Sequence, residues 1–108
     1  MHYKIDQTET HIRVTVDGDL DAAMVQDMRA SADDAANDRR NLIIDLSRVE
    51  FMDSAGVGLI VRAYKVRQST KVPMAIVVGS AGQPREILRT TQIDRLIPFH
   101  ASLEDALA

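Results

Sequence analysis

The sequence predicts a single α/β domain with a mixed, mostly parallel sheet of four to five strands and about four helices. Three observations lead to this fold class. The chain has 108 residues, which suits one hydrophobic core, so residues 1–108 are expected to form one domain. Two strand patterns open the chain with no helix between them, which predicts an antiparallel hairpin. Strand and helix patterns then alternate, which predicts parallel strands joined by helical crossovers.

The hairpin strands are predicted at residues 3–6 and 10–17. Apolar and polar side chains alternate along the second strand, which is the period-two pattern of a half-buried strand. Gly18 ends this strand, and a helix is predicted over residues 20–38. Asp21 is the candidate N-cap of this helix, because a carboxylate there can accept hydrogen bonds from the N–H groups of the first turn.

The later elements follow from apolar runs and helix-start signals. They are predicted at residues 42–46 (strand), 54–68 (helix), 74–78 (strand), 84–91 (helix), 97–100 (a brief extended piece) and 102–108 (helix). The two strands are almost continuous apolar runs, which suits central strands buried on both faces. Pro84 lies in a first helical turn, and Ser102 is the candidate N-cap of the last helix.

Composition excludes several classes of protein. With 45% hydrophobic and 27% charged residues, the chain is typical of a soluble globular domain. It has no cysteine, which excludes disulfides and thiolate chemistry and fits a reducing compartment, so we expect a cytoplasmic location. A net charge of −3 argues against nucleic-acid binding. No apolar stretch approaches about 18 residues, so no membrane span is expected.

Charge is unevenly distributed along the chain. Residues 1–50 carry eleven acidic and six basic residues, whereas residues 51–108 carry five and seven. This asymmetry fits either solvated helix faces or a surface that meets a partner.

The most informative segment is the connection that leads from residues 42–46 to the helix beginning at Ser54. A serine at a helix start can cap the first-turn N–H groups, and the same groups favour an anion. A phosphate on Ser54 would add about 1.5 to 2 negative charges there. Asp53 would concentrate negative charge on the same corner. The structural alternative is that Ser54 is merely the N-cap.

Two glycines follow Ser54 within the first turns of this helix. Gly56 and Gly58 each lower helix propensity by up to about 1 kcal/mol relative to alanine. Their presence suggests close approach by another backbone or by a partner, although both could simply allow close packing.

Catalytic chemistries fit these residues less well. A serine nucleophile elbow needs G-x-S-x-G, but Met52 occupies the first glycine position. The start of a dinucleotide fingerprint at Gly56 lacks its third glycine, because Val61 stands there. A phospho-accepting Asp53 would need clustered acids for Mg²⁺, and the first strand supplies only one acid. The histidines, which lie in strand or edge segments without metal-ligand spacing, are His2, His11 and His100. We therefore expect no catalytic residue, metal or cofactor, and a protein that is not an enzyme.

The helix after Ser54 carries more apolar surface than one core contact requires. At about 100° per residue, Leu59, Ile60, Ala63 and Val66 form the arc that faces the sheet. Other side chains of the helix, outside this arc, would form a mixed apolar and basic patch beside Ser54: Val57, Val61, Arg62, Tyr64 and Lys65. Such a patch is typical of a protein-docking surface. The alternative is that the last helix covers it.

The segment from Asn41 to Leu59 resembles the signature of STAS domains in bacterial anti-sigma factor antagonists, where a D-S-(A/G/S)-G corner follows a buried strand. The resemblance extends over nearly the whole chain. Residues 17–21 resemble the family's G-x-L-D motif before the first helix, and residues 84–89 and 93–98 resemble its later helix and closing strand.

The resemblance implies a single STAS-type domain that acts as a partner switch. In the family, the unphosphorylated protein binds an anti-sigma factor that is also a serine kinase, of the HATPase type, and a sigma factor is released. The kinase then phosphorylates the serine that matches Ser54, the complex dissociates, and a PP2C-type phosphatase resets the switch. By motif position, Asp53 is the neighbour recognised by the kinase and Asp21 is a partner contact.

These inferences define one expected partner-binding set. It comprises Asp21, Asp53, Ser54, Ala55, Gly56, Val57, Gly58, Val61, Arg62, Tyr64 and Lys65. The chain is expected to be a monomer or weak dimer that binds neither nucleic acid nor membrane. The alternative is a STAS scaffold or sensor module that is never phosphorylated.

Overall fold

The computed structural model describes residues 2–107 and contains one five-stranded sheet with strand order β1-β2-β3-β4-β5. β1 (Tyr3–Gln7) is antiparallel to β2 (His11–Asp17). β3 (Asn41–Arg48) is parallel to β2, β4 (Met74–Val77) is parallel to β3, and β5 (Phe99–His100) is parallel to β4. The predicted mixed, mostly parallel sheet and its opening hairpin are therefore confirmed.

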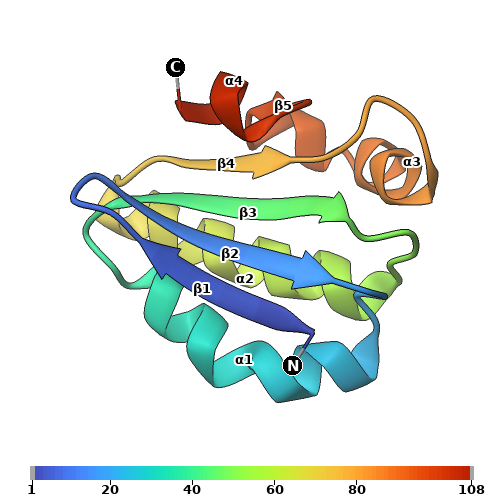
Figure 1. Ribbon diagram of the computed structural model, residues 1–108, viewed down its shortest axis with the longest axis horizontal. Coiled ribbons are helices and arrows are strands. Elements are labelled where there is room, and N and C mark those ends of the chain that lie inside the picture. The colour runs from blue at the N-terminus through green and yellow to red at the C-terminus, as the bar shows by residue number, and fades with distance from the viewer. Residues whose placement is uncertain (1, 108) are drawn as a thin grey trace.

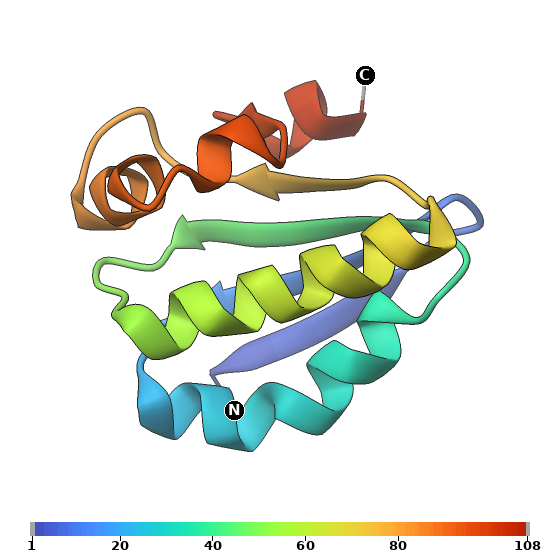
Figure 2. The ribbon, with the colours of Figure 1, turned by 180° about the vertical axis from the view of Figure 1, so that it is seen from behind.

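Helices cover the sheet unequally. Their bounds are α1 Ala22–Ala36, α2 Ser54–Thr70, α3 Gln83–Thr90 and α4 Leu103–Leu107, with a short 3₁₀ helix, η1, at Ile93–Arg95 that the sequence did not predict. Figure 2 shows α1 and α2 side by side across one face of the sheet. On the opposite face, no helix within residues 2–107 lies over β1, β2 and β3 (Figure 1). No helix within residues 2–107 is long and apolar enough to cross a membrane.

The central strand β3 is buried on both faces, as its apolar run predicted. Leu42, Ile44 and Leu46 belong to the main core, which lies between the sheet and α1 and α2. Ile43 is also buried but lies outside that core, because side chains alternate between the faces of a strand. Asp45 lies on the same face of β3 as Ile43. The Asp45 carboxylate accepts hydrogen bonds from the Ser47 N–H (3.0 Å) and hydroxyl (2.6 Å).

One charged side chain enters the core from α2. The apolar pattern placed Val66 on the core-facing arc, but Val66 is only half-buried, and Arg67 is 2% exposed. The Arg67 guanidinium donates hydrogen bonds to the carbonyl oxygens of Arg40 (2.7 Å) and Ala35 (2.9 Å). Burial lowers the pKa of Arg67 below its ordinary value, although arginine remains protonated in proteins. Arg67 thus joins α2 to the end of α1 and the start of β3.

Candidate functional site

The corner that precedes α2 is an extension of the sheet. Leu20 and Met52 form a parallel β-bridge just beyond the ends of β2 and β3. The Leu20 N–H donates to the Phe51 carbonyl (2.9 Å), and the Asp53 N–H donates to the Leu20 carbonyl (3.4 Å). The segments that follow β2 and β3 leave the sheet at the same edge. α1 and α2 therefore begin beside each other there (Figure 2).

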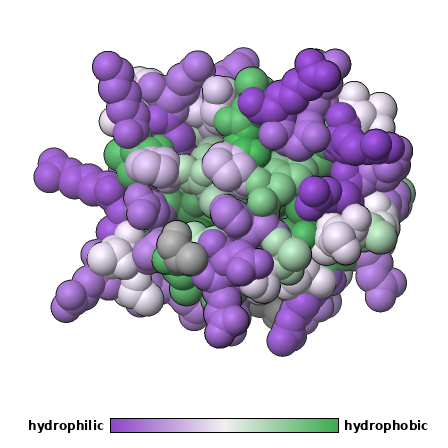
Figure 3. All heavy atoms as spheres, turned by 90° about the horizontal axis from the view of Figure 1, so that it is seen from above, coloured by the Kyte–Doolittle hydropathy of each residue, from purple (hydrophilic) through white to green (hydrophobic). Residues whose placement is uncertain are grey.

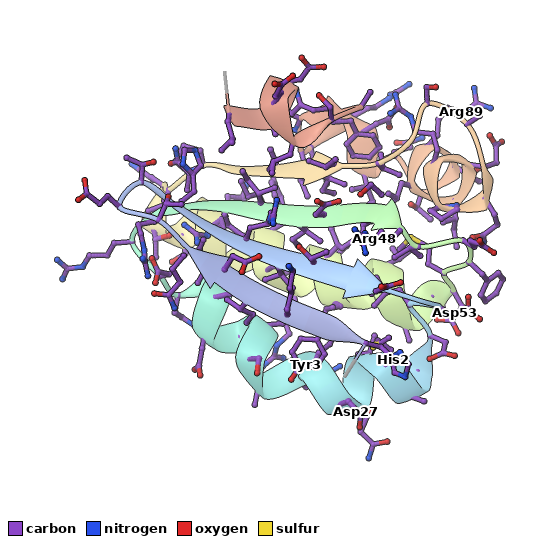
Figure 4. The ribbon with its side chains drawn as sticks, viewed as in Figure 1. His2, Tyr3, Asp27, Arg48, Asp53 and Arg89 are labelled. Atoms are coloured by element: carbon purple, nitrogen blue, oxygen red, sulfur yellow. The ribbon has the colours of Figure 1, made fainter. Side chains whose placement is uncertain are left out.

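Asp53, and not Ser54, caps α2. The Asp53 carboxylate accepts a hydrogen bond from the Ala55 N–H at 2.9 Å, and its backbone is extended, as an N-cap residue requires. The structural alternative that Ser54 is the cap is therefore wrong. Ser54 is the first residue of α2 and is exposed, and its hydroxyl makes no hydrogen bond within residues 2–107. Asp53 marks this corner in Figure 4.

The neighbouring helix start is capped in the same way. Asp21 accepts a hydrogen bond from the Met24 N–H at 3.0 Å, which confirms the predicted N-cap of α1. Several acids lie at the last residue of β2 or in the segments that follow β2 and β3: Asp17, Asp19, Asp21, Glu50 and Asp53. Of these acids, Asp53 is the direct chain neighbour of Ser54.

The two glycines of α2 have different environments. A Cβ atom on Gly56 would lie 2.7 Å from the Leu20 carbonyl oxygen and 2.9 Å from the Leu20 Cγ. The prediction of close backbone approach is confirmed at Gly56. A Cβ atom on Gly58 would meet nothing within 4 Å among the described residues, so the fold does not require glycine there.

An open groove of about 640 Å³ borders Ser54 and follows the outer side of α2 toward the end of α1. Its lining residues are Asp33, Asn37, Ser54, Val57, Gly58, Val61, Arg62, Lys65 and Val66. α4 contacts β4 and β5, and Val57 and Val61 stay partly exposed, so the alternative that the last helix covers the patch is wrong. Tyr64 and Ala55 are half-buried against the core and lie outside the groove lining.

The groove is less basic than the sequence predicted. Arg62 donates two hydrogen bonds to Asp33 of α1, at 2.8 and 3.1 Å, and this pairing lowers the pKa of the Asp33 carboxyl below its ordinary value. The charge of Arg62 is therefore largely matched. Lys65 makes no ion pair within residues 2–107 and is the remaining cation of the groove.

Phe51 is a feature of the corner that no motif or apolar pattern in the sequence predicts. Its side chain is 45% exposed although its carbonyl is fixed by Leu20. The other large exposed apolar residues of the described chain are Leu96 and Leu107. Figure 3 looks onto the sheet edge near β5, where apolar side chains show between charged ones. Exposed aromatic side chains are enriched at protein interfaces, so Phe51 extends the candidate surface beyond α2.

A second hollow, of about 360 Å³, is lined by Arg13, Thr15, Asp45 and Arg48 on the helix-free face of the sheet, where Arg48 is labelled in Figure 4. Its charged side chains are paired locally, as in the ion pairs Arg13 with Asp6 (3.1 Å) and Arg48 with Asp17 (3.6 Å). Ser54 does not line it. The candidate site is therefore the corner with the groove along α2.

The assignment of the cap gives a direct prediction. Replacing Asp53 with alanine should lower the free energy of unfolding by about 1 kcal/mol, because the Ala55 N–H loses its partner. Replacing Ser54 with alanine should change it by less than about 0.5 kcal/mol, because an exposed hydroxyl without a partner is removed. Urea unfolding measures both values. A larger loss for Ser54→Ala than for Asp53→Ala would contradict the assignment.

Several solved structures with the same fold are described as anti-sigma factor antagonists. One, from Mycobacterium paratuberculosis, is 24% identical with a TM-score of 0.82, and the match covers 97% of this chain and 89% of that one. Unphosphorylated SpoIIAA is 21% identical with a TM-score of 0.78, covering 97% and 92%. The Bacillus cell fate determinant SpoIIAA in its phosphorylated form is 20% identical with a TM-score of 0.70, covering 97% and 96%. No functionally curated protein matches significantly in sequence.

The fold and the corner define a small α/β domain of the class that includes these antagonists. The family model for the STAS domain matches residues 2–106. The chain therefore belongs to the STAS domain family, as the resemblance of residues 41–59 predicted.

Proposed function

We propose that this protein is an anti-sigma factor antagonist that switches partners through Ser54. Unmodified, it binds an anti-sigma factor that is also a serine kinase of the HATPase type, and phosphorylation of Ser54 releases it. The observation that carries this proposal is the exposed Ser54 hydroxyl, which is not used for capping and borders an open groove. The two forms in which SpoIIAA has been solved support a phosphorylated state for this fold.

The position of Ser54 allows phosphorylation without unfolding. It is the first residue of α2, where the helix dipole favours a negative group. A phosphate adds about 1.5 to 2 negative charges. Within the fold these charges stay in solvent, but in a complex they would be desolvated beside Asp53 and Glu50. Like-charge repulsion and desolvation then favour dissociation.

The groove indicates how a partner would dock. Val57 and Val61 supply apolar contact, Lys65 favours an acidic group on the partner, and Gly58 allows a close approach. Phe51 and the caps Asp53 and Asp21 lie at the same sheet edge. In this role the protein is a substrate of a kinase and of a PP2C-type phosphatase rather than an enzyme. It works in the cytoplasm as a monomer or weak dimer.

The test uses the full chain with its cognate kinase and ATP. Mass spectrometry should find one phosphate on Ser54, and Ser54→Ala should receive none. Ser54→Asp should bind the kinase at least tenfold more weakly than wild type, as measured by calorimetry, because it adds a charge at the docking corner.

Ser69→Asp is the matched control for this test. It adds the same charge fifteen residues further along α2, about 22 Å from Ser54, so its affinity should stay within about twofold of wild type. An unmodified Ser54 together with wild-type affinity of Ser54→Asp would contradict the proposal.

A further inference from the structure

The backbone of residues 51–53, directly before Ser54, is hydrogen-bonded on two sides. On one side, the backbone of Leu20 bonds to Phe51 and Asp53. On the other side, the side-chain amide of Gln83 bonds to Met52, 31 residues away in sequence. The Met52 N–H donates to Gln83 Oε1 at 2.8 Å, and Gln83 Nε2 donates to the Met52 carbonyl at 2.8 Å. The Gln83 amide thus pairs with this segment as a neighbouring strand would.

The backbone at the start of α3 places Gln83 beside Met52. Gln83 is the first residue of α3, and the residue before it, Gly82, has φ of +108°, a conformation that side chains rarely adopt. The Met52 side chain is fully buried in the core, so core packing also restrains this residue. Met52 lies two residues before Ser54, and only the cap Asp53 separates them.

Resting on the proposed function, we propose that Gln83 is a positioning residue for the phosphorylation of Ser54. In that reaction the Ser54 Oγ attacks the γ-phosphorus of the ATP bound to the kinase. The new O–P bond forms as the bond to the bridging oxygen breaks, ADP leaves, and the serine proton passes to a base of the kinase or to water. Both polar atoms of the Gln83 amide are engaged with Met52, so Gln83 acts through this backbone.

The effect of losing the pair follows from the hydrogen bonds that remain. Without Gln83, the Met52 N–H and carbonyl lose their protein partners, and only Leu20 holds residues 51–53 laterally. The start of α2 then samples more positions. Transfer reactions are sensitive to such motion, because a misplacement of about 1 Å can slow them up to about 100-fold.

Hydrogen exchange on the full chain tests the pair without any kinase. In Gln83→Met, which keeps the side-chain length but removes both bonds, the Met52 amide should exchange at least tenfold faster, while Ile44 in β3 keeps its protection. Gln83→Glu keeps an acceptor for the Met52 N–H and should give an intermediate rate. Gln26→Met, on the exposed side of α1, is the matched control and should change neither amide. Unchanged Met52 exchange in Gln83→Met would overturn the proposal.

Phosphorylation kinetics then test the positioning role. We expect kcat for Gln83→Met to fall about tenfold with KM within about twofold of wild type, partial recovery in Gln83→Glu, and no change in Gln26→Met. A raised KM with unchanged kcat would overturn positioning, because it would make Gln83 a docking contact. An unphosphorylated wild type would overturn both this proposal and the proposed function. A phosphorylated wild type with equal kinetics in Gln83→Met would overturn this one alone.

Discussion

Replacing Gly56 with alanine should lower the free energy of unfolding by about 2 to 3 kcal/mol, although alanine is the better helix former. The new Cβ would lie 2.7 Å from the Leu20 carbonyl oxygen. Leu20 is fully buried, and its backbone is bonded to Phe51 and Asp53, so it has little room to move. The overpacking therefore outweighs a gain in helix propensity of up to about 1 kcal/mol. Urea unfolding at neutral pH measures the difference.

The same substitution at Gly58 is the matched control. No atom of the part of the chain that the structure describes lies within 4 Å of a Cβ atom there, so Gly58→Ala should raise the free energy of unfolding by up to about 1 kcal/mol. The alanine methyl group at position 58 would lie at the groove that Gly58 lines. A variant that is more stable but binds the kinase more weakly would support the groove as the docking surface. Equal losses of stability at the two positions would contradict the close approach assigned to Gly56.

Replacing Arg67 with methionine should lower the free energy of unfolding by about 3 to 4 kcal/mol. Methionine fills much of the same volume, but the carbonyl oxygens of Ala35 and Arg40 would lose donors at 2.9 and 2.7 Å. Because Arg67 is 2% exposed, water does not readily replace those donors. Arg67→Lys keeps the charge but not the forked geometry that reaches both carbonyls, and it should lose about 2 kcal/mol.

Arg89→Met is the control for the loss of an arginine. Arg89 pairs with Glu86 on the exposed side of α3, and its side chain is 65% exposed, so its loss should change stability by less than about 0.5 kcal/mol. Thermal and urea unfolding should show the largest loss of stability for Arg67→Met, a smaller loss for Arg67→Lys and the smallest change for Arg89→Met. An Arg67→Met loss below about 1 kcal/mol would show that the carbonyl contacts contribute little.

The local pattern of the sequence determined the elements and their order. The alternation in residues 10–17 and the apolar runs at 42–46 and 74–78 became β2, β3 and β4. Asp21 was identified as a cap from its residue type alone. Strand patterns and helix caps depend on residues only a few positions apart, so the spacing of residues along the chain predicts them directly.

The resemblance of residues 41–59 to the STAS signature located the candidate corner as well, because its residues are contiguous in sequence. It did not assign the cap of α2. Aspartate and serine are both good cap residues, and only the backbone conformation placed Asp53 in that position and left the Ser54 hydroxyl exposed.

Other properties of the site were decided only by the tertiary structure. Gly56 and Gly58 are alike in sequence, but the packing of Leu20 makes only the first necessary. Arg67 breaks the apolar pattern of α2, yet two distant carbonyls accept hydrogen bonds from its guanidinium in the core. Gln83 reaches Met52 across 31 residues. Each of these contacts joins elements far apart in sequence, and hydrophobic periodicity, which describes only one helix or strand at a time, cannot specify them.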